Sequence, residues 1–256
     1  MLVGKMLSEN RIAYAKANGA AQYAWGTYGE IGVQPIENTP NLFLFTFPSE
    51  EIWEKVWLAR PWSLSNTLTT IEKWNGRGLP KEVPLDRLAM WVQVHRLHQN
   101  MRVESNIDAI GSHYFPKFID LDRSGLEYND YRLFSRMLVE VDLREPVPTG
   151  FDFPFTDEKT GIEYCEWVSF KYERLVELCY FCGRIGHNWP TCGLMAEERK
   201  VNREVGLSEI YNSSLKAGVD SPRRVSPANA RIQRGDGFSQ STTERERTRS
   251  ERQSLL

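Results

Sequence analysis

The chain has 256 residues, of which 41 % are hydrophobic and eight are tryptophan, a composition that excludes a mainly disordered protein. Its formal net charge is only −2, but the charge is unevenly distributed. Residues 200–256 carry eleven Lys/Arg and seven Asp/Glu, a net +4, which leaves −6 for residues 1–199. We therefore expect any attraction of phosphate groups to be confined to the C-terminal part of the chain.

No stretch reaches the roughly 18 uninterrupted apolar residues of a membrane span. The first residues also lack the basic, apolar and small-residue pattern of a secretory signal. These patterns predict an intracellular protein without a membrane partner. Because residues 1–6 already resemble a strand, we expect the chain to begin inside an element, with a truncated N-terminus.

Residues 1–74 predict a first α+β domain. Strand patterns cover residues 1–6, 31–36, 41–47 and 67–74, and helix patterns cover 10–25 and the stretch from Ser49, a typical helix N-cap, to just before Pro61. Pro35 restricts the second strand to a sheet edge. The order strand, helix, strand, strand, helix, strand is that of an RRM-like or ferredoxin-like split βαβ sandwich.

Three phenylalanines, Phe43, Phe45 and Phe47, alternate along the third strand of this domain and share one face. An RRM carries base-stacking aromatics on such a strand. It also places a basic residue and a glycine before them, which this sequence lacks. The pattern therefore favours a core position for these rings over contact with a nucleic acid.

Residues 75–87 read as a Gly/Pro linker, and residues 88–176 predict a second, small α+β unit. We expect strands over 88–94, 117–121, 131–143 and 163–172, a helix over 101–114, and a Pro/Gly-rich loop over 146–161. This unit runs directly into the next motif, so we expect the two to be braced against each other.

The sequence predicts no enzyme and no small-molecule substrate. Two acidic pairs, at 120 and 122 and at 140 and 142, alternate with apolar residues, as on the solvated face of a sheet. No phosphate-binding Walker loop, nucleophile elbow or zinc-protease motif is present.

The most informative motif lies in residues 177–194, where three of the four cysteines and one histidine are concentrated. The spacing is Cys, two residues, Cys, four residues, His, four residues, Cys, and the candidate ligands are Cys179, Cys182, His187 and Cys192. Three thiolates and one imidazole complete a closed tetrahedral zinc site, so we predict one structural Zn²⁺ with no catalytic vacancy. Since so short a segment has little apolar core, the ion must supply about 10 to 16 kcal/mol of folding free energy, and the segment should unfold without it.

These residues resemble the CCHC zinc knuckle of retroviral nucleocapsid and retrotransposon gag proteins, which bind single-stranded nucleic acid. The resemblance implies that Tyr180 and Trp189 form a cleft in which an unpaired base stacks, and that Arg184 meets phosphate. Stacking contributes about 1 to 3 kcal/mol per base and tolerates any sequence, so one knuckle implies weak, permissive binding. Alternatively, the two rings cover the metal or contact the preceding domain.

The arrangement as a whole, over about residues 1–195, resembles a large plant family in which a retrotransposon-derived domain of unknown function precedes a CCHC knuckle. Members look like gag-type or LINE first-reading-frame proteins, and the resemblance implies binding of zinc and nucleic acid without catalysis. The stretches that carry it, besides the knuckle, are Leu2-Val3-Gly4-Lys5, Asn41-Leu42-Phe43-Leu44-Phe45, Arg60-Pro61-Trp62-Ser63, Trp91-Val92-Gln93-Val94 and Lys171-Tyr172-Glu173-Arg174-Leu175.

Residues 195–256 read as a short helix-prone run followed by a polar tail, which we expect to be disordered from about residue 207. Two functions from different classes remain open. In the first, the knuckle binds single-stranded RNA or DNA with help from the basic tail. In the second, the knuckle only staples the fold, and the acidic body is a module for protein interaction or self-association.

Overall fold

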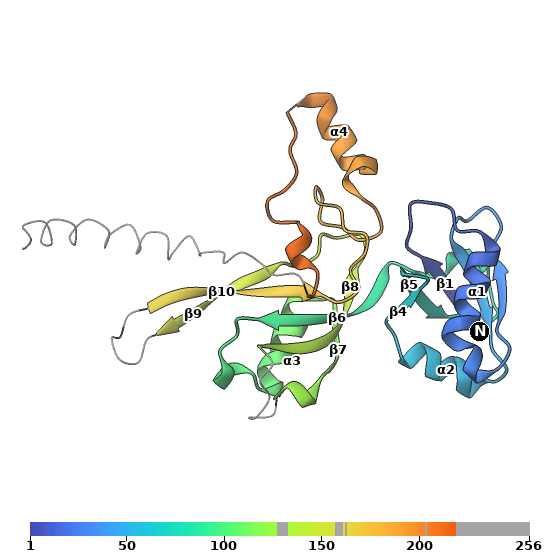
Figure 1. The fold of residues 1–256 in the computed structure, drawn as a ribbon, viewed down its shortest axis with the longest axis horizontal. Helices are drawn as coiled ribbons and strands as arrows, with labels where there is room; N and C mark the ends of the chain where they lie inside the picture. The colour runs from blue at the N-terminus through green and yellow to red at the C-terminus, as the bar shows by residue number, and fades with distance from the viewer. Residues whose placement is uncertain (127–132, 157–160, 162, 203, 219–256) are drawn as a thin grey trace, which may run out of the picture. The chain divides into compact units, whose positions relative to one another are not determined.

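The computed structural model describes residues 1–126, 133–156, 161, 163–202 and 204–218. The chain divides into two compact units. The larger takes in Met1–Thr149 and Ser169–Ser221, and the smaller includes Gly150–Val168. Figure 1 shows the ribbon, coloured along the chain. Among the helices of the described residues, none combines the length and the apolar character that crossing a bilayer requires.

The N-terminal α+β domain is a five-stranded antiparallel sheet with two helices. Its elements are β1 (Leu2–Met6), α1 (Tyr14–Trp25), β2 (Gly32–Pro35), β3 (Leu42–Thr46), α2 (Glu50–Leu58), β4 (Trp62–Leu64) and β5 (Thr67–Lys73). The spatial order β2-β3-β1-β5-β4 has the first strand in the centre, flanked by the third and the last, so the predicted split βαβ arrangement is confirmed. The short β4, which forms a hairpin with β5, was not predicted, and Pro35 does lie on an edge strand.

Helix α1 begins four residues later than the hydrophobic pattern predicts, and the cause is Asn41. The Oδ1 atom of Asn41 accepts the backbone N–H of Ile12 at 2.7 Å, and its Nδ2 donates to the carbonyls of Ser8 and Asn10 at 2.8 and 3.0 Å. These bonds fix residues 8–12 as a loop. Ser49 stands at the N-cap of α2 as predicted, but its side chain makes no capping hydrogen bond.

The core of this domain lies between the sheet and its helices. Trp25 is fully buried at its centre, with ring centroids 5.1 Å from Phe45 and 5.5 Å from Trp62. Phe43 and Phe45 are 2 % and 0 % exposed, and Phe47 lies against the same cluster. The predicted core position of the three phenylalanines is therefore confirmed.

The opposite face of this sheet is also covered. Val3 points away from the helix side, because its neighbours Leu2 and Met6 belong to the core there, yet Val3 is 0 % exposed. The hydroxyl of Thr70, on the same face as Val3, donates to the carbonyl of Arg87 at 2.7 Å. The chain therefore buries the surface on which an RRM binds RNA.

The second sheet repeats the strand order of the first. Its elements are β6 (Arg87–His95), α3 (Glu104–Tyr114), β7 (Lys117–Leu121), β8 (Phe134–Asp142), β9 (Gly150–Thr156) and β10 (Glu163–Tyr172). The order β7-β8-β6-β10-β9 again places the first strand between the third and the last, with the extra strand at an edge. The difference is that residues 143–149, between β8 and β9, form no second helix. The predicted start of β8 at residues 131–132 lies outside the described residues.

Strand β9 replaces part of the loop predicted over residues 146–161. Phe151, Phe153 and Phe155 alternate with polar residues and Pro154, which is a strand period, but Gly150 and Pro154 make the stretch read as a loop. Proline is tolerated here because β9 is an edge strand and needs no ladder bond on its outer side.

The remaining helix is α4 (Gly193–Val201), and six short 3-10 turns complete the described structure. The turns are η1 (Gly26–Tyr28), η2 (Pro80–Glu82), η3 (Gln99–Met101), η4 (Arg123–Leu126), η5 (Trp189–Thr191) and η6 (Ser213–Leu215).

Candidate metal centre

The four predicted ligands meet on a tight loop that follows β10. The backbone N–H of Gly183 donates to the carbonyl of Cys179 at 2.9 Å, and the N–H of Cys179 donates to the carbonyl of Arg184 at 3.0 Å. Gly183 has a φ of +73°, a conformation that glycine adopts without steric cost. This turn brings Cys179 and Cys182 to the same side of the loop.

The side chains of Cys179, Cys182, His187 and Cys192 converge, and their ligand atoms all lie within 4.8 Å of one another. The Sγ of Cys182 and the Nε2 of His187 are 3.4 Å apart. A tetrahedral zinc ion with Zn–S bonds of about 2.3 Å separates its sulfur ligands by about 3.8 Å, so little movement is needed to close the site. Three sulfurs and one imidazole nitrogen are the donor set of structural zinc sites, and these four residues would hold the ion.

The electrostatics of the loop favour a bound cation. Burial, together with the neighbouring Cys179 and Cys192 sulfurs, raises the pKa of the Cys182 thiol to about 12, so a positive ion is needed to keep it ionised at neutral pH. The backbone N–H of Cys182 points at the Cys179 sulfur at 3.5 Å, which also favours a thiolate. Burial lowers the pKa of His187, so its ring is neutral and available as a ligand at pH 7.

A small apolar cluster supports the ligands from below. Cys179 and Cys192 are buried with Met195 of α4, and Phe181 and Val205 lie against them. The N–H of Ala196 donates to the carbonyl of Cys192 at 3.0 Å, so the last ligand also begins α4. The knuckle therefore includes one apolar contact layer that its sequence spacing does not reveal.

Residues 208–217 form a strap across the knuckle, although the sequence predicts disorder from about residue 207. The N–H of Ser208 donates to the carbonyl of Tyr180, and the N–H of Ala217 donates to the carbonyl of Tyr172, each at 3.0 Å. The ring of Tyr211 lies so close to Gly183 that a Cβ there would be 2.4 Å from it. The apolar residues of the strap, with Leu215 buried, explain its order; the predicted tail beyond residue 218 lies outside the described residues.

Two further contacts hold the knuckle from distant parts of the chain. The N–H of Val147, just after β8, donates to the carbonyl of Gly183 at 2.9 Å, in agreement with the expected bracing by the second unit. The Glu9 carboxylate accepts the N–H of Asn188 at 2.5 Å and the hydroxyl of Thr191. These hydrogen bonds, first the one from Thr191, lower the pKa of Glu9. Sequence reasoning missed Glu9 because it lies 179 residues from Asn188.

The three predicted nucleic-acid contacts differ in accessibility. Trp189 lies in η5, between the two residues that bind Glu9, and is 37 % exposed. Tyr180 and Arg184 are only half-buried, and the Nε of Arg184 is buried without a hydrogen-bond partner among the described residues. Neither Tyr180 nor Trp189 contacts another aromatic ring within the described part of the chain, so their faces are not taken up by ring stacking.

The face of the second sheet opposite α3 offers no alternative basic surface. Its prominent cation, Arg136, binds Glu173 through two nitrogens at 2.7 and 2.8 Å and Asp122 at 3.1 Å, and it lies 4.3 Å above the Trp91 ring. Gln93 joins the same network through Glu173 at 2.9 Å. Because the carboxylates neutralise the guanidinium, this face resembles a satisfied polar network rather than a phosphate-binding surface.

Comparisons with known proteins agree with this division of the chain. Residues 1–80 match the family model described as Domain of unknown function (DUF4283), and residues 162–194 match the model described as Zinc knuckle. Neither the curated proteins nor the solved structures contain a match to the chain. The chain therefore carries a DUF4283 domain followed by a CCHC-type zinc knuckle whose four ligand side chains lie together.

Proposed function

We propose that the protein binds one Zn²⁺ at the knuckle and uses the loaded knuckle to bind single-stranded RNA or DNA, without catalysing a reaction. The observation that carries the proposal is the convergence of Cys179, Cys182, His187 and Cys192 beside the exposed indole of Trp189. An unpaired base can stack on that indole, whereas the faces of both sheets are occupied by the chain itself. The carboxylates at 120, 122 and 142 are bonded to arginines, which supports binding over catalysis.

A retrotransposon-derived, gag-like origin is part of the same proposal. It is supported by the order of a DUF4283 domain and a CCHC knuckle, together with the sequence resemblance described above. Proteins of that kind pair a nucleic-acid-binding knuckle with an assembling body, which is the division of labour proposed here.

The proposal is tested by the anisotropy of a labelled G-rich single strand titrated with the protein. Trp189→Ala is expected to weaken binding about 5-fold to 150-fold, since stacking contributes about 1 to 3 kcal/mol. Tyr23→Ala is the matched control, because Tyr23 is an aromatic residue on α1 that is 94 % exposed. Removing the metal with a chelator should abolish the Trp189-dependent part. Equal affinities for the two variants would refute stacking on the knuckle.

A second function, self-association, is favoured by the hairpin of the smaller unit. The rings of Phe151, Phe153 and Phe155 share one face of β9, with centroids 6.2 and 4.8 Å apart, and Tyr164 stacks on Phe155 at 5.7 Å. All four rings are half-buried, so they retain exposed apolar surface. Light scattering would test this function: if the chain forms oligomers, Phe153→Ser should dissociate them, and a wild-type chain that stays monomeric would exclude it.

A further inference from the structure

The knuckle itself lacks the charge to hold a phosphate backbone. Residues 172–218, which contain the end of β10, the metal loop, α4 and the strap, carry six Lys/Arg and six Asp/Glu. Their net charge is therefore zero, and the chain before residue 200 is acidic. Because affinity for single strands depends on neutralising phosphates, the cations must come from another part of the fold.

A hollow of about 610 Å³ adjoins the metal loop at Gly186 and His187. All of its lining residues belong to the larger compact unit. They include Lys5 of β1, Lys81 of η2, and Arg144 just after β8. The only acidic residue among them is Asp86, so the lining carries a net charge of +2 within an acidic body.

The two lysines are the available cations of this hollow. Arg144 is bound to Asp86 and to Asp142, each at 2.8 Å, so its charge is already neutralised. Both Lys5 and Lys81 are exposed, and neither ammonium group has an ion pair or hydrogen bond among the residues that the structure describes. Lysine on its flexible stem binds phosphate as a point charge and needs no fixed geometry.

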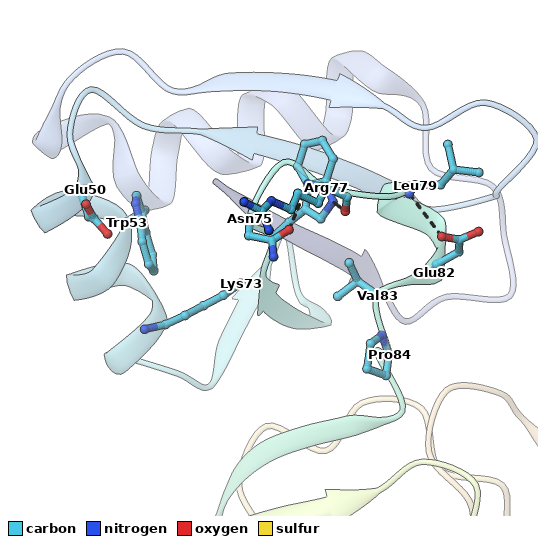
Figure 2. A pocket seen from close by; sticks show the side chains of 10 residues that line it. Glu50, Trp53, Lys73, Asn75, Arg77, Leu79, Glu82, Val83 and Pro84 are labelled. Carbon is cyan, nitrogen blue, oxygen red and sulfur yellow. Dashed lines mark hydrogen bonds between the residues drawn. The ribbon is translucent and has the colours of Figure 1, made fainter.

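The other large hollow lacks this excess of positive charge. It measures about 640 Å³ and is lined by Lys73 and Arg77 but also by Glu50 and Glu82 (Figure 2). Lys73 extends toward α2, where its ammonium lies 4.3 Å from the Trp57 ring centre and 3.5 Å from a Glu54 oxygen. Two carboxylates therefore balance the two cations in this hollow.

We propose that the hollow beside His187 binds the phosphates of a single strand whose base stacks on the knuckle, with Lys5 and Lys81 as the phosphate ligands. This inference rests on the proposed function and adds the path of the backbone to it. The sequence places the phosphate contacts in the knuckle and tail, whereas the fold brings two cations from the DUF4283 domain and the linker to the knuckle.

The test measures how the affinity for a labelled single strand of about ten nucleotides falls with salt. Lys5→Glu/Lys81→Glu should lower the slope of log K against log salt by about 1.4, and affinity near 0.1 M salt about 10-fold or more, since each phosphate contact contributes about 0.7 to the slope. Lys16→Glu/Arg77→Glu is the matched control: the change in charge is the same, both residues are exposed, and neither lines this hollow. Equal thermal stability and zinc content of the two variants exclude a folding defect.

The outcomes separate this inference from the function on which it rests. Trp189→Ala should weaken binding without changing the salt slope, because stacking releases no counterions. A wild-type slope in Lys5→Glu/Lys81→Glu, or an equal loss in the control, would overturn the phosphate path and leave the knuckle as the site. If the wild-type protein did not bind the strand at all, both proposals would be overturned.

Discussion

Replacing Gly183 by alanine tests how tightly the strap and the metal loop depend on each other. Gly183 has a φ of +73°, and an L-residue in that conformation costs about 1 to 2 kcal/mol. The new Cβ would also lie 2.4 Å from the Tyr211 ring, so the strap must shift, and overpacking of this kind costs about 1 to 3 kcal/mol. Together the two effects predict a loss of about 2 to 5 kcal/mol from the loaded knuckle.

Because metal binding and folding of the knuckle are coupled, this loss should appear as weaker zinc binding, by about 30-fold to 4,000-fold. Competition against a chromophoric chelator measures it directly. Gly193→Ala is the control, since Gly193 begins α4 and a Cβ there would meet nothing within 4 Å. In a Tyr211→Ala background, Gly183→Ala should cost about 1 to 3 kcal/mol less, because the ring is gone. If Gly183→Ala bound zinc as tightly as Gly193→Ala, the strap would not be part of the metal site.

Three further predictions concern the metal, the first core and the second sheet. Chelation of the metal should unfold the knuckle and release the strap, so amide exchange at Ser208 and Ala217 should accelerate while that of β3 stays slow; unchanged exchange at both would contradict this coupling. Phe45→Ala should destabilise the N-terminal domain by about 3 to 5 kcal/mol in thermal unfolding and leave the oligonucleotide affinity of folded protein unchanged, because the ring is 0 % exposed; normal stability with weakened binding would instead indicate a base-stacking face. Burial, with smaller effects of nearby cations, lowers the pKa of His95 to about 4, so the unfolded chain takes up a proton that the folded chain excludes, and the stability present above about pH 6.5 is lost as the pH falls toward 4. The stability of the wild type relative to His95→Gln, from urea unfolding at about pH 7.5 and about pH 5, should therefore decrease on acidification, and a constant difference would refute the shift; the zinc ligands are common to both proteins.

The sequence predicts the features that depend on local spacing. The ligands from Cys179 to Cys192 lie within one short loop, so their order along the chain nearly determines their convergence in space. The strand order of the first sheet also follows from the order of its elements, because a split βαβ unit has few ways to close. Phe45 was assigned to the core from the absence of an RRM signature, and its burial confirms that argument.

The features that sequence reasoning missed depend on contacts between distant residues or on edge positions. Glu9 supports the turn of Trp189 from the far end of the chain, and no local pattern identifies such a carboxylate. Pro154 argued against a strand, and only the edge position of β9 makes it acceptable. The strap has a polar composition typical of disorder, but a single tyrosine fits onto a residue without a side chain.

The two sheets share a strand order that is used for nucleic-acid recognition elsewhere, yet neither has a free face of the required chemistry. On the first sheet the face is covered, with Val3 fully buried, and on the second Arg136 is neutralised by Glu173. The sheets therefore act as a frame that holds the knuckle through Glu9 and Val147. A frame of this kind reduces the freedom of the Trp189 turn before any ligand arrives, so less entropy is lost on binding than in an isolated knuckle. It follows that Glu9→Gln, which keeps the shape of the side chain but weakens its hydrogen bonds, should lower affinity for a single strand even though it removes a negative charge near the site.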